Sequence, residues 1–114
     1  MGDEVFGKRK FPRYRCNVAV IIYQGGAAGQ GRITNISRGG CLIYPPLVSQ
    51  EDPELRLSFR LSDDLPYINC KGEIVYTITD RGTGVRFSEI SVHNQDFITD
   101  YFERQCGAEK SGAV

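Results

Sequence analysis

The chain has 114 residues, with 40% hydrophobic and 25% charged side chains, which is typical of one globular domain and excludes a wholly disordered chain. Fourteen Lys and Arg residues balance fourteen Asp and Glu residues, so no overall field attracts the chain to DNA or to an anionic membrane. No apolar run approaches the ~20 residues of a membrane span, and the N-terminus lacks the apolar core of a signal peptide. We therefore expect a cytoplasmic protein that does not insert into a membrane.

The densest positive charge lies near the N-terminus, where residues 8–15 carry five Lys or Arg side chains. Pro12 disfavours a helix, so this arm is predicted to be extended. Arg9 and Arg13 can then lie up to ~13 Å apart. Because guanidinium groups bind phosphate and the guanine edge in bidentate fashion, they could hold different parts of one anionic ligand. A solvated basic tail is the alternative interpretation.

Strand and turn signals follow the arm. Residues 18–22 are rich in β-branched side chains, and the glycine-rich segment 25–31 is predicted to be a flexible hairpin loop. Residues 32–37 resume as a strand, and residues 41–44 continue as another until Pro45 ends it.

Three further strands are predicted after the prolines. Residues 55–62 alternate strictly between apolar and polar side chains, which indicates a strand with one solvent-exposed face and therefore an antiparallel sheet. Residues 84–87 form a short last strand, after a long strand over residues 67–79. One phase of that long strand is apolar, and we expect it to face the core: Ile68, Cys70, Ile74, Tyr76 and Ile78.

A helix is predicted at the end of the chain. Ser91 or Asn94 can cap it and Gly107 is expected to end it, with an apolar stripe formed by Phe97, Ile98, Tyr101 and Phe102. Six short strands and one helix predict an all-β domain, a six-stranded antiparallel barrel covered by the helix. The expected divisions are a flexible N-terminus at 1–7, the arm at 8–15, the barrel at 16–90, the helix at 91–106 and a flexible tail at 107–114.

Few residues suit catalysis or metal binding. His93 is the only histidine, the four cysteines include no C-x-x-C pair, and the sequence has no nucleophile elbow, zincin motif or phosphate-binding loop. We therefore expect no enzyme activity and no cofactor, with His93 exposed and the cysteines filling the core.

Asn35 and Ser37 lie two residues apart on a predicted strand, so their side chains share one face while Ile36 points inward. Gly39 and Gly40 follow and would permit a positive φ and the close approach of a ligand. Taken alone, this segment could also be an ordinary strand end.

The two elements together resemble the PilZ domain family. Arg9 and Arg13 form an R-x-x-x-R motif, and Asn35, Ser37 and Gly40 form an N-x-S-x-x-G motif across a predicted hairpin. Residues 82–87 are also similar to the closing strand of the family, and the resemblance covers residues 8–106. It implies a six-stranded antiparallel barrel that binds cyclic di-GMP, with the arm wrapped around the ligand.

The resemblance also implies roles for individual residues. Arg9 and Arg13 would contact phosphate and guanine, Asn35 and Ser37 would donate or accept hydrogen bonds, and Gly40 would shape the turn. Family members with an arginine at the position of Lys8 tend to bind a stacked pair of ligands. With a lysine there, the number of bound ligands, one or two, stays open. The residues expected at the ligand are Lys8, Arg9, Arg13, Asn35, Ser37, Arg38, Gly39 and Gly40.

With no output domain in the sequence, we expect an adaptor. Ligand binding would order the arm and favour an effector protein, and the chain would be a monomer or a weak dimer. Two alternatives remain open. One is a PilZ-like interaction module that binds no nucleotide, and the other is a small barrel for single-stranded nucleic acid, although the cations here are concentrated in the arm rather than in a groove.

Overall fold

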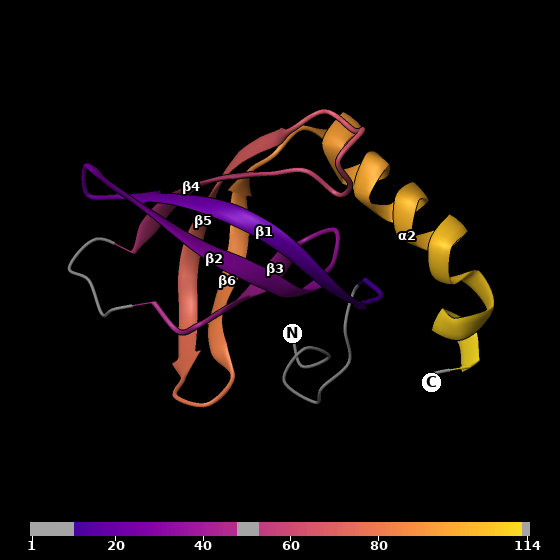
Figure 1. Cartoon of the computed structure of the whole chain (residues 1–114), viewed down its shortest axis with the longest axis horizontal. Helices are drawn as coiled ribbons and strands as arrows, with labels where there is room; N and C mark the ends of the chain where they lie inside the picture. The colour runs from indigo at the N-terminus through magenta and orange to yellow at the C-terminus, as the bar shows by residue number, and fades with distance from the viewer. Residues whose placement is uncertain (1–10, 48–52, 113–114) are drawn as a thin grey trace, which may run out of the picture.

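The computed structural model of the chain describes residues 11–47 and 53–112, with only the backbone for residues 106–112. Its strands form a closed antiparallel barrel in the order β1-β2-β3-β6-β5-β4 (Figure 1), which confirms the expected fold. The elements are β1 (Tyr14–Gln24), β2 (Ala27–Ile36), β3 (Gly40–Tyr44), β4 (Glu54–Phe59), β5 (Ile68–Ile78), β6 (Gly82–Glu89) and α2 (Val92–Gly112).

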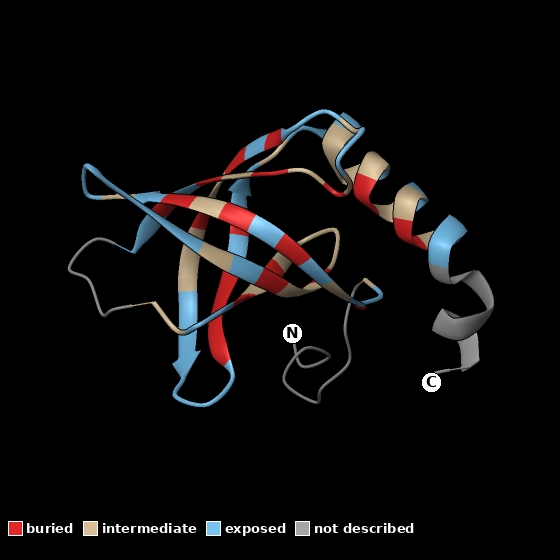
Figure 2. Ribbon diagram, in the orientation of Figure 1, coloured by how far each residue is buried: buried red, intermediate tan, exposed pale blue. Residues whose placement is uncertain are grey.

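The core fills the interior of the barrel, as the alternation of apolar and polar residues predicts. Along β4, the side chains of Leu55, Leu57 and Phe59 are buried, and the polar residues between them face outward. The same alternation is visible in β1 as buried and exposed bands (Figure 2). Antiparallel pairing brings these inward faces together, so each strand contributes to one continuous apolar cluster.

The hairpin between β1 and β2 is tighter than the sequence suggested. Gly25 and Gly26 alone form the turn, with φ angles of 58° and 85°, and β2 begins at Ala27. The expected loop over residues 25–31 is therefore wrong. Positive φ at both central positions suits the twist of a two-residue hairpin turn, so the following glycines join the ladder.

The second half of β5 departs from the expected apolar phase. Ile68 and Cys70 face the core, but the pairing with β6 shifts between Ile74 and Tyr76, and both Tyr76 and Ile78 are exposed. A register shift of this kind turns the following side chains to another face. The Tyr76 ring instead covers Gly84, where a β-carbon would overlap the ring.

Helix α2 lies beside the end of the barrel at which β1 begins (Figure 1). Ile98 and Phe102 are buried, and the Tyr14 ring of β1 stacks on Phe102 with centroids 5.3 Å apart. The Tyr14 hydroxyl also donates a hydrogen bond of 2.7 Å to Oε2 of Glu103. These contacts place Tyr14 in the barrel, whereas the sequence predicts it in the arm.

The two ends of α2 are also defined. The Asn94 N–H donates to Oγ of Ser91 at 3.0 Å, as a capping residue requires. The helix continues past Gly107 to Gly112, because a single interior glycine costs only about 1 kcal/mol. Within the described residues, no helix combines the length and the apolar character needed to cross a bilayer.

The cysteines with described side chains belong to the core rather than to a reactive site. Cys41 and Cys70 are buried, and Cys16 is half-buried with its Sγ 3.4 Å from the Ile33 carbonyl oxygen. Burial raises the pKa of both buried thiols, that of Cys70 to about 12. They are therefore neutral near pH 7, as expected of core-filling side chains.

Candidate ligand-binding site

The turn from β2 to β3 forms the centre of the candidate site. Ile36 is buried as expected, and Ser37 begins the turn, with its N–H donating to the Gly40 carbonyl at 2.8 Å. Oγ of Ser37 accepts a hydrogen bond of 3.1 Å from the Gly39 N–H. Because a hydroxyl both donates and accepts, this bond leaves the Ser37 proton available for another acceptor.

Asn35 precedes this turn on the outer face of the barrel. It pairs with Arg15 of β1 and with Leu42 of β3, and register shifts interrupt the ladder beside it on both sides. Its Oδ1 atom is buried and has no hydrogen-bond partner in the described part of the chain. An unsatisfied buried acceptor costs about 1–3 kcal/mol, so a donor from a bound molecule would recover this loss.

The described part of the arm reaches the same turn. A β-carbon on Gly39 would lie 3.5 Å from ring atoms of Phe11, so the ring packs against this glycine. Arg13 is exposed and directly precedes Tyr14, which pairs with Ile36. Arg13 and Ser37 therefore extend from neighbouring ends of two paired strands. Lys8 and Arg9 lie outside the described residues.

Arg38 is turned toward α2. Its Nη1 atom lies 2.7 Å from Oδ1 of Asp96, and its carbonyl oxygen accepts a hydrogen bond of 3.0 Å from Nε2 of Gln95. In this arrangement the guanidinium holds the start of the helix against the turn. The motif predicts Arg38 at the ligand, whereas in the structure its guanidinium is paired with Asp96.

The glycines of the motif serve packing rather than unusual backbone angles. Neither Gly39 nor Gly40 has a positive φ, so that expectation is wrong. A β-carbon on Gly40 would instead overlap the carbonyl oxygen of Val85, because β3 and β6 approach closely there. The Phe87 N–H also donates to the Gly39 carbonyl at 2.9 Å and fixes this approach.

Gly40→Ala is expected to destabilise the fold by about 1–3 kcal/mol, since the added methyl group must push the β6 backbone away. Urea unfolding of the variant measures this change. Gly29→Ala is the matched control, because a β-carbon at that position meets no atom within 4 Å. Equal stability of the two variants would contradict the tight contact between β3 and β6.

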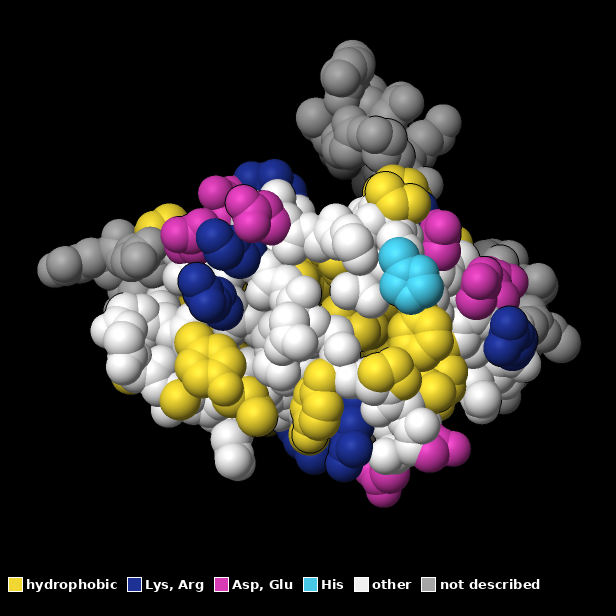
Figure 3. Space-filling view, turned by 90° about the horizontal axis from the view of Figure 1, so that it is seen from above, with side chains coloured by type: hydrophobic (Ala, Val, Ile, Leu, Met, Phe, Trp, Pro, Cys, Tyr) yellow, Lys and Arg dark blue, Asp and Glu magenta, His cyan; other side chains and the backbone are white. Residues whose placement is uncertain are grey.

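Three features of the site could not be read from the motifs alone. Phe11 contacts Gly39, Arg15 lies beside Asn35, and Asp96 pairs with Arg38. Only Arg15 carries a sequence signal, because it shares a face with Arg13 on an extended chain. His93 is exposed near the start of α2 (Figure 3), and the described residues include no cluster of ligands suited to a metal ion.

Solved structures with the same fold were found. Chains similar to this one include the motility inhibitor MotI (DgrA) of Bacillus subtilis, with 22% identity and a TM-score of 0.67 over 85% of this chain and 50% of that one. The PlzA protein of Borreliella burgdorferi, in complex with c-di-GMP, has 21% identity and a TM-score of 0.66 over 88% of this chain and 44% of that one. This chain thus spans about half the length of those two chains.

The PilZ domain of YcgR from Escherichia coli, with c-di-GMP, has 14% identity and a TM-score of 0.64 over 93% of this chain and 98% of that domain. No curated protein sequence matched. The model of the PilZ domain matches residues 7–104, a span that includes the arm, the barrel and most of α2. The chain therefore belongs to the PilZ domain family.

Proposed function

We propose that this chain is a cyclic di-GMP receptor that binds the dinucleotide between its N-terminal arm and the β2–β3 turn. The observation that carries the proposal is the buried Oδ1 of Asn35, the strand partner of Arg15, which has no hydrogen-bond partner among the described residues. Guanine presents N–H donors on its Watson–Crick edge, which suit such an acceptor. PlzA and the YcgR domain, which share this fold, were solved with c-di-GMP, and this supports the same ligand here.

The other groups at the turn suit the remaining chemistry of the ligand. Cyclic di-GMP has two phosphodiester charges and two guanine bases, and guanidinium forks bind both kinds of group. In the proposal, Arg9 and Arg13 bind phosphate and guanine. The Ser37 hydroxyl donates a hydrogen bond to a ligand oxygen. Lys8 adds positive charge to the arm, where either one ligand or a stacked pair could bind. The proposed role is binding and relay without a catalytic step, in the cytoplasm where the messenger acts.

Helix α2 is the proposed route to an effector protein. It contacts the turn through Arg38 and the start of β1 through Tyr14. A ligand phosphate that attracted the Arg38 guanidinium would compete with Asp96 and weaken one of these two contacts. Binding would then change the surface that α2 presents, and an effector that prefers the changed surface would be recruited.

Asp96→Asn tests this competition. If the ion pair withholds Arg38 from the ligand, the substitution should raise the affinity for cyclic di-GMP by up to about fivefold, since a partly exposed ion pair contributes about 0–1 kcal/mol. Calorimetric titration of the variant measures the change, with Asp100→Asn as the control at an exposed acid on the same helix. An unchanged or lower affinity would contradict a role for Arg38 at the ligand.

Titration calorimetry of the full chain with cyclic di-GMP tests the function itself and reports the number of ligands bound. Saturable binding with one or two molecules per chain is expected, and a single-stranded oligonucleotide should neither bind comparably nor compete. The absence of cyclic di-GMP binding would overturn the proposal and favour an interaction module without nucleotide. Binding of the oligonucleotide alone would instead favour the nucleic-acid alternative.

A further inference from the structure

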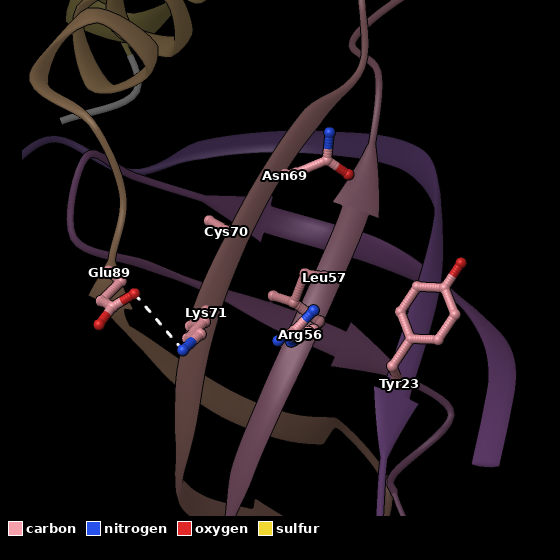
Figure 4. Close-up of a pocket in the computed structure, with 7 residues that line it drawn as sticks. All are labelled: Tyr23, Arg56, Leu57, Asn69, Cys70, Lys71 and Glu89. Atoms are coloured by element: carbon pink, nitrogen blue, oxygen red, sulfur yellow. Dashed lines mark ion pairs between the residues drawn. The ribbon is translucent and has the colours of Figure 1, made fainter. Parts of the chain in front are cut away.

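A second candidate surface lies across the barrel from the β2–β3 turn. The strand register places four side chains in one lateral row on the outer face: Tyr23 of β1, Arg56 of β4, Lys71 of β5 and Glu89 of β6. With Leu57, Asn69 and Cys70 they line a hollow of about 560 Å³ (Figure 4). The row joins residues that are far apart in the sequence and forms only when the barrel closes.

The charges in this row are not balanced. Arg56 and Lys71 are direct cross-strand partners, and like charges in that relation destabilise a sheet. Nζ of Lys71 lies 3.6 Å from Oε1 of Glu89, whereas Arg56 forms no ion pair with any described carboxylate. The next acidic side chain on β5, Glu73, is paired with Arg86. One further anionic group would therefore balance the charge of the hollow.

The other walls of the hollow are apolar or neutral. The Tyr23 side chain is exposed beside Arg56, and Leu57 and Cys70 also line the hollow but are buried, with their side chains directed into the core. Asn69 offers both an amide donor and a carbonyl acceptor, as a peptide group requires. A single excess positive charge suits a carboxylate, and Glu89 would repel a doubly charged phosphate.

We propose that this row, Tyr23–Arg56–Lys71–Glu89, is a docking surface for an acidic peptide segment of a partner protein. A Glu or Asp side chain of the partner lies between Arg56 and Lys71, and an adjacent apolar side chain packs on the Tyr23 ring. The Asn69 amide binds the peptide backbone between them. This surface is separate from the proposed nucleotide site, and the inference does not depend on cyclic di-GMP binding.

The probe for this surface is the blocked peptide acetyl-Leu-Glu-Leu-amide, titrated into the ¹⁵N-labelled full chain. Saturable amide shifts are expected at Tyr23, Arg56, Asn69 and Lys71. Arg56→Gln should weaken binding about tenfold, because it removes one charge-assisted hydrogen bond. Arg81→Gln, at an exposed arginine of the β5–β6 turn, is the matched control and should leave binding unchanged.

Two further titrations decide the nature of the occupant. The peptide with Gln in place of Glu should bind about tenfold more weakly, and equal binding of the two peptides would overturn the charge argument. Inorganic phosphate that shifted the same amides at lower concentration than the peptide would show an anion site instead and would also overturn the proposal. Arg56→Gln should melt at the temperature of the parent chain or slightly above it, because it removes a like-charge pair, so weaker binding would not be a result of unfolding.

Discussion

Arg13→Ala is expected to weaken cyclic di-GMP binding by about thirtyfold or more, because removing one side of a desolvated charge pair costs roughly 2–5 kcal/mol. Arg9→Ala should have an effect of the same order. Arg13 is exposed in the structure, so its loss should leave the melting temperature unchanged. Arg13→Lys should also lose affinity, since an ammonium group cannot reproduce the two parallel hydrogen bonds of a guanidinium.

Titration calorimetry and thermal melting on the same protein preparations measure both effects. Arg104→Ala is the control, since this arginine is exposed on α2 at a distance from the motif in sequence; it should bind as the parent chain does. Parent affinity in both Arg9→Ala and Arg13→Ala would remove the arm from the binding site, whatever the ligand proves to be.

Asn35 and Ile36 are expected to give opposite results, because neighbouring strand residues face opposite sides of the barrel wall. Ile36 is 1% exposed, so Ile36→Ala should destabilise the fold by about 2–5 kcal/mol through a core cavity. Asn35→Ala removes a buried acceptor that has no described partner and should leave stability unchanged or slightly higher. Its affinity for cyclic di-GMP should fall by about 0.5–1.5 kcal/mol, the contribution of one neutral hydrogen bond.

Paired melts and titrations on both variants test this contrast, and Ser37→Ala extends it. Ser37→Ala loses the acceptor of the Gly39 N–H as well as the hydroxyl proposed to contact the ligand, so both stability and affinity should fall modestly, by about 1 kcal/mol each. A harmless Ile36→Ala together with an unfolded Asn35→Ala would invert the assigned faces and move the site elsewhere.

The barrel could be predicted because the alternation of apolar and polar residues along each strand indicates which side chains face the core and which face solvent. The alternation of apolar and polar residues around Leu57 predicts an antiparallel strand with one face exposed to solvent, and the buried residues of β4 confirm it. The same reasoning was wrong beyond Ile74, where a register shift turns Tyr76 outward. The residues of one strand do not reveal where a register shift will occur, because the shift depends on how β5 pairs with β6.

The sequence by itself determined the fold class, the motif residues and the inward position of Ile36, because these follow from short-range periodicity and from the chemistry of each side chain. Only the tertiary structure decided what these groups contact. It paired Arg38 with Asp96 of α2, left Oδ1 of Asn35 without a described partner, and placed Arg56 beside Lys71. Such contacts depend on strand register and on where the helix packs, and both are set by the closure of the whole barrel rather than by any local segment.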